Sequence, residues 1–360
     1  MQDGRKKEKI YKHADKIYSM RYIPILRLGT TEHGILMDDL SRNLQMLPHL
    51  EVANLDLFRR NIQAINSRFG DVLVELPEYL AERTNKHQES VQNILNQYEQ
   101  VDFYTNFQSQ IGIPVVSCMK SRRDYSVLLD RFRSLRDQFD RVAVRCFVYQ
   151  PVLTITQLRN LTSLFEDLRN EDIILFDILK FLRIERRQIQ KLRRILETMS
   201  YLAPESDAYI LNALCSDLHN YGPLLANILD LNGFGDFSTT RRFEASGGRG
   251  ALPKIIRYYY SSSHELIRFE HDTSYLVAVQ DLTNSSYWDN NVSGGHLGYC
   301  NVCNEIHSNQ HNNAPVYWKR YRIVHYIKSV VNETLPSIPG TDPRSLDIDG
   351  YDRISRRRGL

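Results

Sequence analysis

The chain has 360 residues, of which 42% are hydrophobic and 25% charged, an ordinary composition for a globular protein with one large barrel or two domains. No apolar run approaches the roughly 18–20 residues of a membrane span, and the basic start GRKKEKIYKHADK lacks the apolar core of a signal peptide. Five cysteines are too few for a disulfide framework, and a net charge of +3 is too small to indicate nucleic acid by itself, so we expect a cytoplasmic protein.

A short β-rich run followed by an amphipathic helix repeats eight times along the first two thirds of the chain. The expected strands are Tyr22–Arg27, Met46–Glu51, Asp71–Glu75, Ile113–Met119, Arg141–Arg145, Ile173–Asp177, Ala208–Asn212 and Phe234–Asp236. Apolar residues at helical spacing follow them, as in Phe58, Ile62, Ile65 and Phe69 or in Leu158, Leu161, Phe165 and Leu168. This alternation predicts an α/β fold, a (β/α)8 barrel of the TIM type that begins at residue 20.

Charged or polar residues end most of these strands, and in such a barrel the carboxyl ends of the strands form the mouth where ligands bind. The mouth would collect Arg27, Glu51, Glu75, Arg145, Asp177, Asn212 and Asp236. The two-residue period of a strand puts Ile25 with Arg27, His49 with Glu51, and Leu175 with Asp177 on shared faces. We therefore expect Glu51, Arg145, Asp177 and Asp236 to point inward and to meet in one cluster.

Two interpretations of these strand-end charges stay open. The carboxylates could hold a divalent cation such as Mg²⁺ or Mn²⁺ and, with Arg27 or Arg145, clamp a phosphoester. Alternatively, Arg145 pairs with Asp177 or Glu51 in a salt-bridge network that closes the top of the barrel.

The pattern changes after residue 240. Residues 255–260 and 275–280 are expected to form a two-stranded antiparallel excursion, and residues 284–315 a long polar loop or lid. Residues 317–331 are expected to form either a closing helix or a strand followed by a helix. We therefore divide the chain into a basic extension (1–19), a barrel that includes a C-terminal β-hairpin and loop region as an insertion (20–335, insertion 241–335), and a disordered tail (336–360).

Two further clusters are candidates for binding. Cys300, Cys303, His307 and His311 are the residue types of a zinc site, but the gap between the two pairs is shorter than in ordinary zinc fingers, and a polar loop is the alternative. The run Arg257–Tyr260 with Lys254 could stack bases and bind phosphate, or could be an edge strand with aromatic cross-strand packing.

The opening YIPILRL and the later PHLEV are followed along the chain, up to residue 332, by VAVRC, ILFDI, FGDF, KIIRYYY and VHYIKSVV. In this order the motifs resemble those of the Beta protein family of satellite phages, prophages and bacterial defence islands, which starts "YVPILK … PLIEV". The resemblance implies a ligand-binding mouth made of Arg27, Glu51, Arg145, Asp177, Asp236, Arg257, Tyr258 and His325. The chain departs from the family at Arg27, where Lys is usual, and at Tyr326.

The resemblance implies a component of a prophage- or satellite-encoded antiphage defence cassette, whose barrel binds a ligand, a cassette-encoded partner protein or a phage-derived component. The alternative is a metal-dependent phosphoester hydrolase or nuclease that works at the barrel mouth. Nucleic acid stays open as a partner, and so does the oligomeric state.

Overall fold

The computed structural model describes residues 20–43, 45–82, 86–117, 125–148, 155–178, 186–211, 221–238, 254–260, 265–288, 305–306 and 315–334. The expected basic extension 1–19 and the expected tail 336–360 lie outside these ranges, as does most of the polar loop 284–315.

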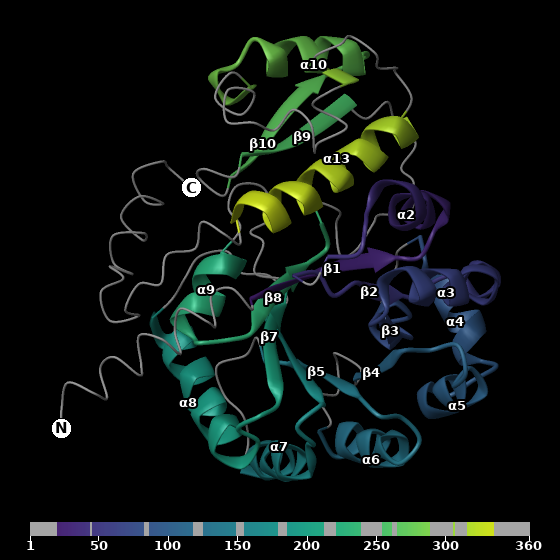
Figure 1. Ribbon diagram of the computed structural model, residues 1–360, viewed down its shortest axis with the longest axis vertical. Coiled ribbons are helices and arrows are strands. Elements are labelled where there is room, and N and C mark those ends of the chain that lie inside the picture. The colour runs from purple at the N-terminus through teal and green to yellow at the C-terminus, as the bar shows by residue number, and fades with distance from the viewer. Residues whose placement is uncertain are drawn as a thin grey trace.

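Eight parallel strands close into a barrel in sequence order, with β1 paired to β8 (Figure 1). They are β1 (Arg21–Arg27), β2 (His49–Glu51), β3 (Leu73–Glu75), β4 (Ile113–Ser117), β5 (Ala143–Phe147), β6 (Ile173–Asp177), β7 (Asp207–Leu211) and β8 (Gly233–Asp236). The predicted (β/α)8 barrel is confirmed, and each strand overlaps the run of residues that predicted it.

Helices cover the outside of the barrel. They are α2 (Thr30–Gly34), α3 (Leu55–Phe69), α4 (Gln88–Leu95), α5 (Gln100–Asn106), α6 (Tyr125–Arg136), α7 (Ile155–Asp167), α8 (Arg186–Leu202) and α9 (Gly222–Ile228), with the shorter turns η1 (Ile35–Asp39) and η2 (Glu78–Leu80). In α3 the side chain of Asn54 caps the first turn, and Gly70, at a φ of 80°, ends the helix in a conformation that few other residues adopt. Leu158 of α7 was expected to face the barrel but is 46% exposed, because Leu161, Leu164 and Phe165 form the buried face instead.

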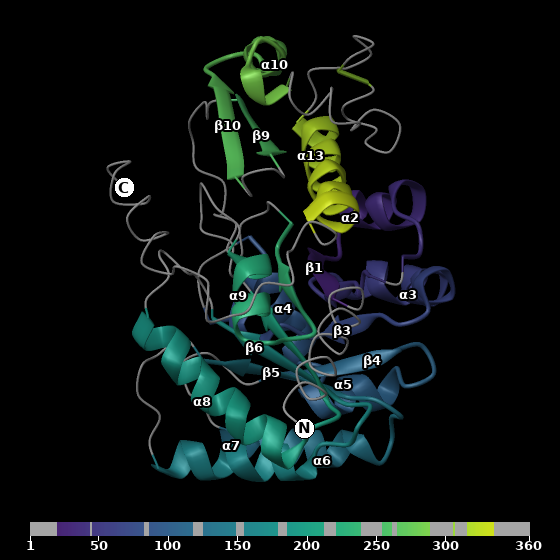
Figure 2. The same ribbon diagram turned by 60° about the vertical axis from the view of Figure 1, so that its left-hand side comes forward.

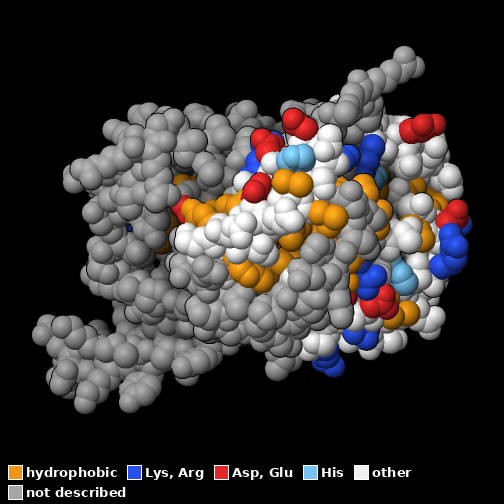
Figure 3. All heavy atoms as spheres, turned by 90° about the horizontal axis from the view of Figure 1, so that it is seen from above, with side chains coloured by type: hydrophobic (Ala, Val, Ile, Leu, Met, Phe, Trp, Pro, Cys, Tyr) orange, Lys and Arg blue, Asp and Glu red, His pale blue; other side chains and the backbone are white. Residues whose placement is uncertain are grey.

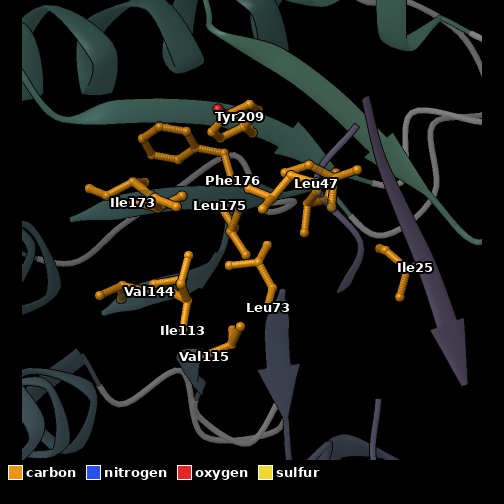
Figure 4. Packing of buried hydrophobic residues seen from close by; sticks show 14 of the residues in the cluster. Ile25, Leu47, Leu73, Ile113, Val115, Val144, Ile173, Leu175, Phe176 and Tyr209 are labelled. Atoms are coloured by element: carbon orange, nitrogen blue, oxygen red, sulfur yellow. The ribbon is translucent and has the colours of Figure 1, made fainter. Parts of the chain in front are cut away.

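The strands bury both of their faces, so the core has an inner and an outer part. Leu73 of β3, Ile113 of β4, and Ile173 and Leu175 of β6 converge in the barrel interior (Figure 4). The strand register also places Arg27, Glu51 and Glu75 side by side on one face of β1, β2 and β3. Apolar layers therefore fill the barrel below its carboxyl end, and charged residues follow at that end.

A second, smaller lobe follows the barrel. It contains the antiparallel pair β9 (Lys254–Tyr260) and β10 (Glu265–His271), helix α10 (Tyr275–Thr283) and helix α13 (Pro315–Ser329), which continues into η4 (Val330–Thr334). In Figure 1 helix α13 lies between the barrel and the hairpin, and in Figure 2 it lies beside the hairpin with its lower end next to α2 of the barrel. The face seen from above mixes hydrophobic with polar and charged side chains (Figure 3). Leu276 of α10 and Val316 of α13 are exposed hydrophobic residues of the lobe.

The expected antiparallel excursion and closing helix are confirmed, but the strand that pairs with β9 is β10 and not the expected residues 275–280. Residues 275–280 were expected to be the second strand, and they begin a helix instead. The Ser274 side chain accepts a hydrogen bond from the backbone of Leu276, and Ala278, Val279 and Leu282 form a buried helical face. Among the described residues, no helix combines the length and hydrophobicity that a membrane crossing requires.

Candidate functional site

Arg145 is the centre of a buried ion network at the carboxyl end of the barrel strands. Its Nε donates to Asp177 Oδ2 at 2.9 Å, and its Nη1 donates to Glu51 Oε1 at 3.2 Å and to Glu75. The guanidinium also lies 5.2 Å from the ring centroid of Tyr79. One side chain of β5 thus joins β2, β3 and β6 across the barrel interior.

Three further side chains complete this network. Arg27 Nε donates to Glu51 Oε2 at 3.0 Å, and the Tyr79 hydroxyl donates to Glu51 Oε1. His49 Nε2 lies 2.8 Å from Glu75 Oε2. Arg145, Glu51, Glu75 and Asp177 are all 0% exposed, so these charges are separated from bulk water and act on one another strongly.

The two guanidinium groups hold the network in its charged form. Burial by itself would raise the pKa of the Glu75 carboxyl, but Arg145 and His49 more than offset this and lower that pKa to about 2. Burial by itself would lower the pKa of Arg145, yet Glu75 and Asp177 raise it well above its ordinary value. In this network two guanidinium groups face three carboxylates.

The structure therefore brings together five of the residues predicted at the mouth, namely Arg27, Glu51, Glu75, Arg145 and Asp177. They form the salt-bridge network that was one of the two interpretations of the strand-end charges. Each of the three carboxylates that a divalent cation would use is paired with a guanidinium group through at least one oxygen. In the described ranges, no group of three or more His, Cys, Asp or Glu side chains is arranged as a metal site.

Asp236 does not join this network, in contrast to its expected inward direction. Its register partner on β1 is Pro24, whereas Ile25 and Arg27 are on the inner face. Asp236 accepts hydrogen bonds from Tyr22 at 2.9 Å and from Tyr326 of α13 at 2.6 Å. Burial raises its pKa, and these hydrogen bonds offset only part of the rise.

The predicted residues of the C-terminal lobe lie apart from the ion network. The rings of Tyr258 and His325 stack at a centroid distance of 4.5 Å, and His325 Nε2 is 3.0 Å from the backbone oxygen of Tyr259. Tyr258 and His325 are almost completely buried. Arg257 is opposite Arg268 in the hairpin. This packing matches the edge-strand interpretation of the aromatic run more closely than a base-stacking surface.

The remaining predicted site residues lie outside the described residues. These are Asn212 at the end of β7 and the candidate zinc ligands Cys300, Cys303, His307 and His311. The zinc prediction therefore stays a prediction.

Several polar side chains near the mouth that lie on helices and turns were not predicted from the sequence. Gln100 of α5 donates to the Ser117 hydroxyl at 3.2 Å, and Arg131 of α6 donates to both oxygens of Glu78 at 2.9 and 3.0 Å. The two-residue period of the strand did place His49 on the face of Glu51. The position of Tyr79 could not be predicted, because no local pattern tells where a side chain beyond the strand will point.

No protein-family model matches the chain, and none of the curated proteins is significantly similar to it. The resemblance to the Beta protein family therefore stays a prediction.

Proposed function

We propose that this protein is a ligand- or partner-binding barrel in a prophage- or satellite-encoded antiphage defence cassette, where it works with a neighbouring gene product. The order of the sequence motifs supports the defence role. The geometry of the mouth supports the binding role.

The observation that carries the binding role is that every carboxylate of the network is engaged by Arg145. A general base works best when its pKa is near the operating pH, and Glu75, with a pKa of about 2, is far too weak a base. A carboxylate that faces a buried guanidinium is also a poor ligand for a second cation. Fixed, paired charged groups that join five strands suit a rigid platform that presents a binding surface.

Asp177 offers the sharpest test of this role. Because two guanidinium groups face three carboxylates, Asp177→Asn leaves two charges of each sign and does not strand a buried cation. The exposed Asp130 of α6 gives a matched control, Asp130→Asn. We expect Asp177→Asn to reduce phage protection while soluble protein is retained, and Asp130→Asn to change neither.

The measurement is a plaque count on a panel of phages, with and without the cassette, with protein levels followed in parallel. Unchanged plating on every phage by the expressed wild-type protein would remove the defence role. Loss of soluble Asp177→Asn protein in proportion to lost protection would mean that the network only stabilises the fold.

A further inference from the structure

Basic side chains from three separate parts of the chain come together beside the end of β1. Arg27 ends this strand, Lys86 and His87 precede α4, and Lys319 belongs to α13. Lys319 Nζ lies 2.6 Å from Glu32 Oε1. We call Arg27, Lys86, His87 and Lys319 the basic rim.

Glu32 ties α13 to the barrel next to Arg27. The other oxygen of Glu32, Oε2, would be only 2.8 Å from a Cβ at Gly29, two residues after Arg27. Lys319 is therefore anchored within a few residues of the end of β1. Arg27 in turn donates to Glu51, so the basic rim is continuous with the ion network of the mouth.

The positive groups of the rim act on one another. Burial lowers the pKa of His87, and Arg27, Lys86 and Lys319 lower it further, to about 3. Burial and Lys319 also lower the pKa of Lys86, although Glu32 acts in the opposite direction. Like charges drawn together in this way are expected where an anion binds, since the anion relieves their repulsion.

We propose that the basic rim binds a small phosphate-bearing ligand, which bridges the barrel and α13. A phosphate group carries up to two negative charges and three acceptor oxygens, which matches cations supplied by three chain segments. The guanidinium of Arg27 offers planar donors, Lys86 and Lys319 act as point charges, and the neutral ring of His87 adds a hydrogen-bonding nitrogen. This inference rests on the proposed binding function and names the class of ligand.

The alternative is that the rim only docks α13, through the pair of Lys319 with Glu32. Calorimetric titration of the full chain with pyrophosphate distinguishes the two, with inorganic phosphate and citrate as further probes. Lys86→Gln and Lys319→Gln each remove one charge of the rim. Lys328→Gln removes the same charge from the far end of α13 and serves as the matched control.

We expect pyrophosphate to bind the wild-type chain and the Lys328→Gln variant equally, and each rim variant about tenfold more weakly, which corresponds to about 1.4 kcal/mol. Nuclear magnetic resonance of His87 gives a readout that docking alone would not move. Bound pyrophosphate should raise the pKa of His87, because it offsets the positive neighbours.

The inference is overturned if pyrophosphate at millimolar concentration produces no binding heat, or if both rim variants bind as the wild type does. Citrate that binds as tightly as pyrophosphate would overturn the phosphate class and assign the rim to polycarboxylates. If pyrophosphate does not bind but the wild-type protein still protects against phages, the basic rim is rejected as a binding site and the proposed function is retained. If pyrophosphate binds but the wild-type protein gives no protection, the proposed defence role is rejected and the binding site is retained.

Discussion

Arg145 is the residue on which the mouth of the barrel depends. It is fully buried, contacts three carboxylates, and lies over the ring of Phe147 at 5.6 Å as well as that of Tyr79. Arg145→Met removes the shared countercharge and leaves Glu51, Glu75 and Asp177 buried together. Breaking such a network from one side destabilises a protein by about 3–5 kcal/mol, and we expect a loss of that size in urea unfolding.

A surface pair supplies the control for this experiment. Arg133 of α6 donates to Asp167 of α7 at 2.6 Å, but it is half exposed to water. Arg133→Met should change the free energy of unfolding by no more than about 1 kcal/mol. Similar losses for Arg133→Met and Arg145→Met would contradict the importance given to burial.

The ionised Glu75 makes the protein sensitive to acid. Its pKa falls from an ordinary 4.5 to about 2 in the folded state, because Arg145 and His49 outweigh the effect of burial. The stability that this group contributes is therefore present above about pH 4.5 and is lost as the pH falls towards 2. In Glu75→Gln the free energy of unfolding should fall less steeply across this window, by up to about 1.4 kcal/mol per pH unit.

Urea titrations at several pH values measure this slope. The exposed Glu89 of α4 gives the comparison variant, Glu89→Gln, whose acid limb should follow that of the wild type. If the free energy of unfolding of Glu75→Gln fell with pH as steeply as that of the wild type, other carboxylates would govern the loss of stability in acid.

The alternation of strand residues was enough to predict that Arg27, Glu51, Arg145 and Asp177 share the barrel interior. It failed at Asp236, although that residue also ends a strand. Side chains of Phe234 and Asp236 point outward because the glycines of β8 take the inward positions. The alternating glycines of the sequence GFGD could have indicated this orientation, because only glycine leaves room for β1 where it pairs with β8.

At the scale of the element, Gly235 shows how β8 closes the barrel. A Cβ at this position would be 2.6 Å from the backbone oxygen of Ile23 and 2.8 Å from its Cβ. Gly235→Ala therefore requires β1 and β8 to separate, and overpacking of this kind destabilises by about 1–3 kcal/mol. Thermal unfolding followed by circular dichroism should show a lower midpoint.

Gly34 of α2 is the matched position for this substitution. The nearest atom to an added Cβ there is Nη1 of Arg320, at 3.6 Å, which is ordinary contact. Alanine is also a better helix former than glycine by roughly 0.5–1 kcal/mol, so Gly34→Ala should leave the midpoint unchanged or raise it. A Gly235→Ala midpoint equal to that of Gly34→Ala would contradict the close approach of β1 and β8.

Helix α10 shows where a local pattern misleads. The run YLVAV is rich in β-branched and aromatic residues, which favoured a strand. Tertiary packing decided otherwise, because Ala278, Val279 and Leu282 cover the second core around Trp288 and Trp318. Ser274, a residue type that often caps helices, was the available sign of a helix. Strand β6, in contrast, was predicted with its observed bounds, because its continuous apolar run allowed one interpretation.

At the scale of the whole molecule, a large barrel core and a small lobe core are joined through α13. In the described residues the lobe contains a two-stranded sheet, which is marginally stable without the elements packed on it. Arg320 of α13 fastens the lobe to η1, with Nε donating to Asp39 at 2.6 Å and Nη2 to Asp38 at 3.1 Å. The lobe should therefore open locally while the barrel stays folded.

Hydrogen exchange measured by mass spectrometry tests this order of stability. In the wild type, amides of β9 and β10 should exchange faster than those of β5 and β6. Arg320→Gln should speed exchange in α13, β9 and β10 about fivefold, the factor for a loss of about 1 kcal/mol, and leave β5 and β6 unchanged. Arg268→Gln, which removes an exposed ion pair within the hairpin, should not speed exchange in α13. If Arg320→Gln accelerated β5 and β6 as much as β9, the barrel and lobe would open as one unit, because the contacts of α13 would then stabilise the whole molecule.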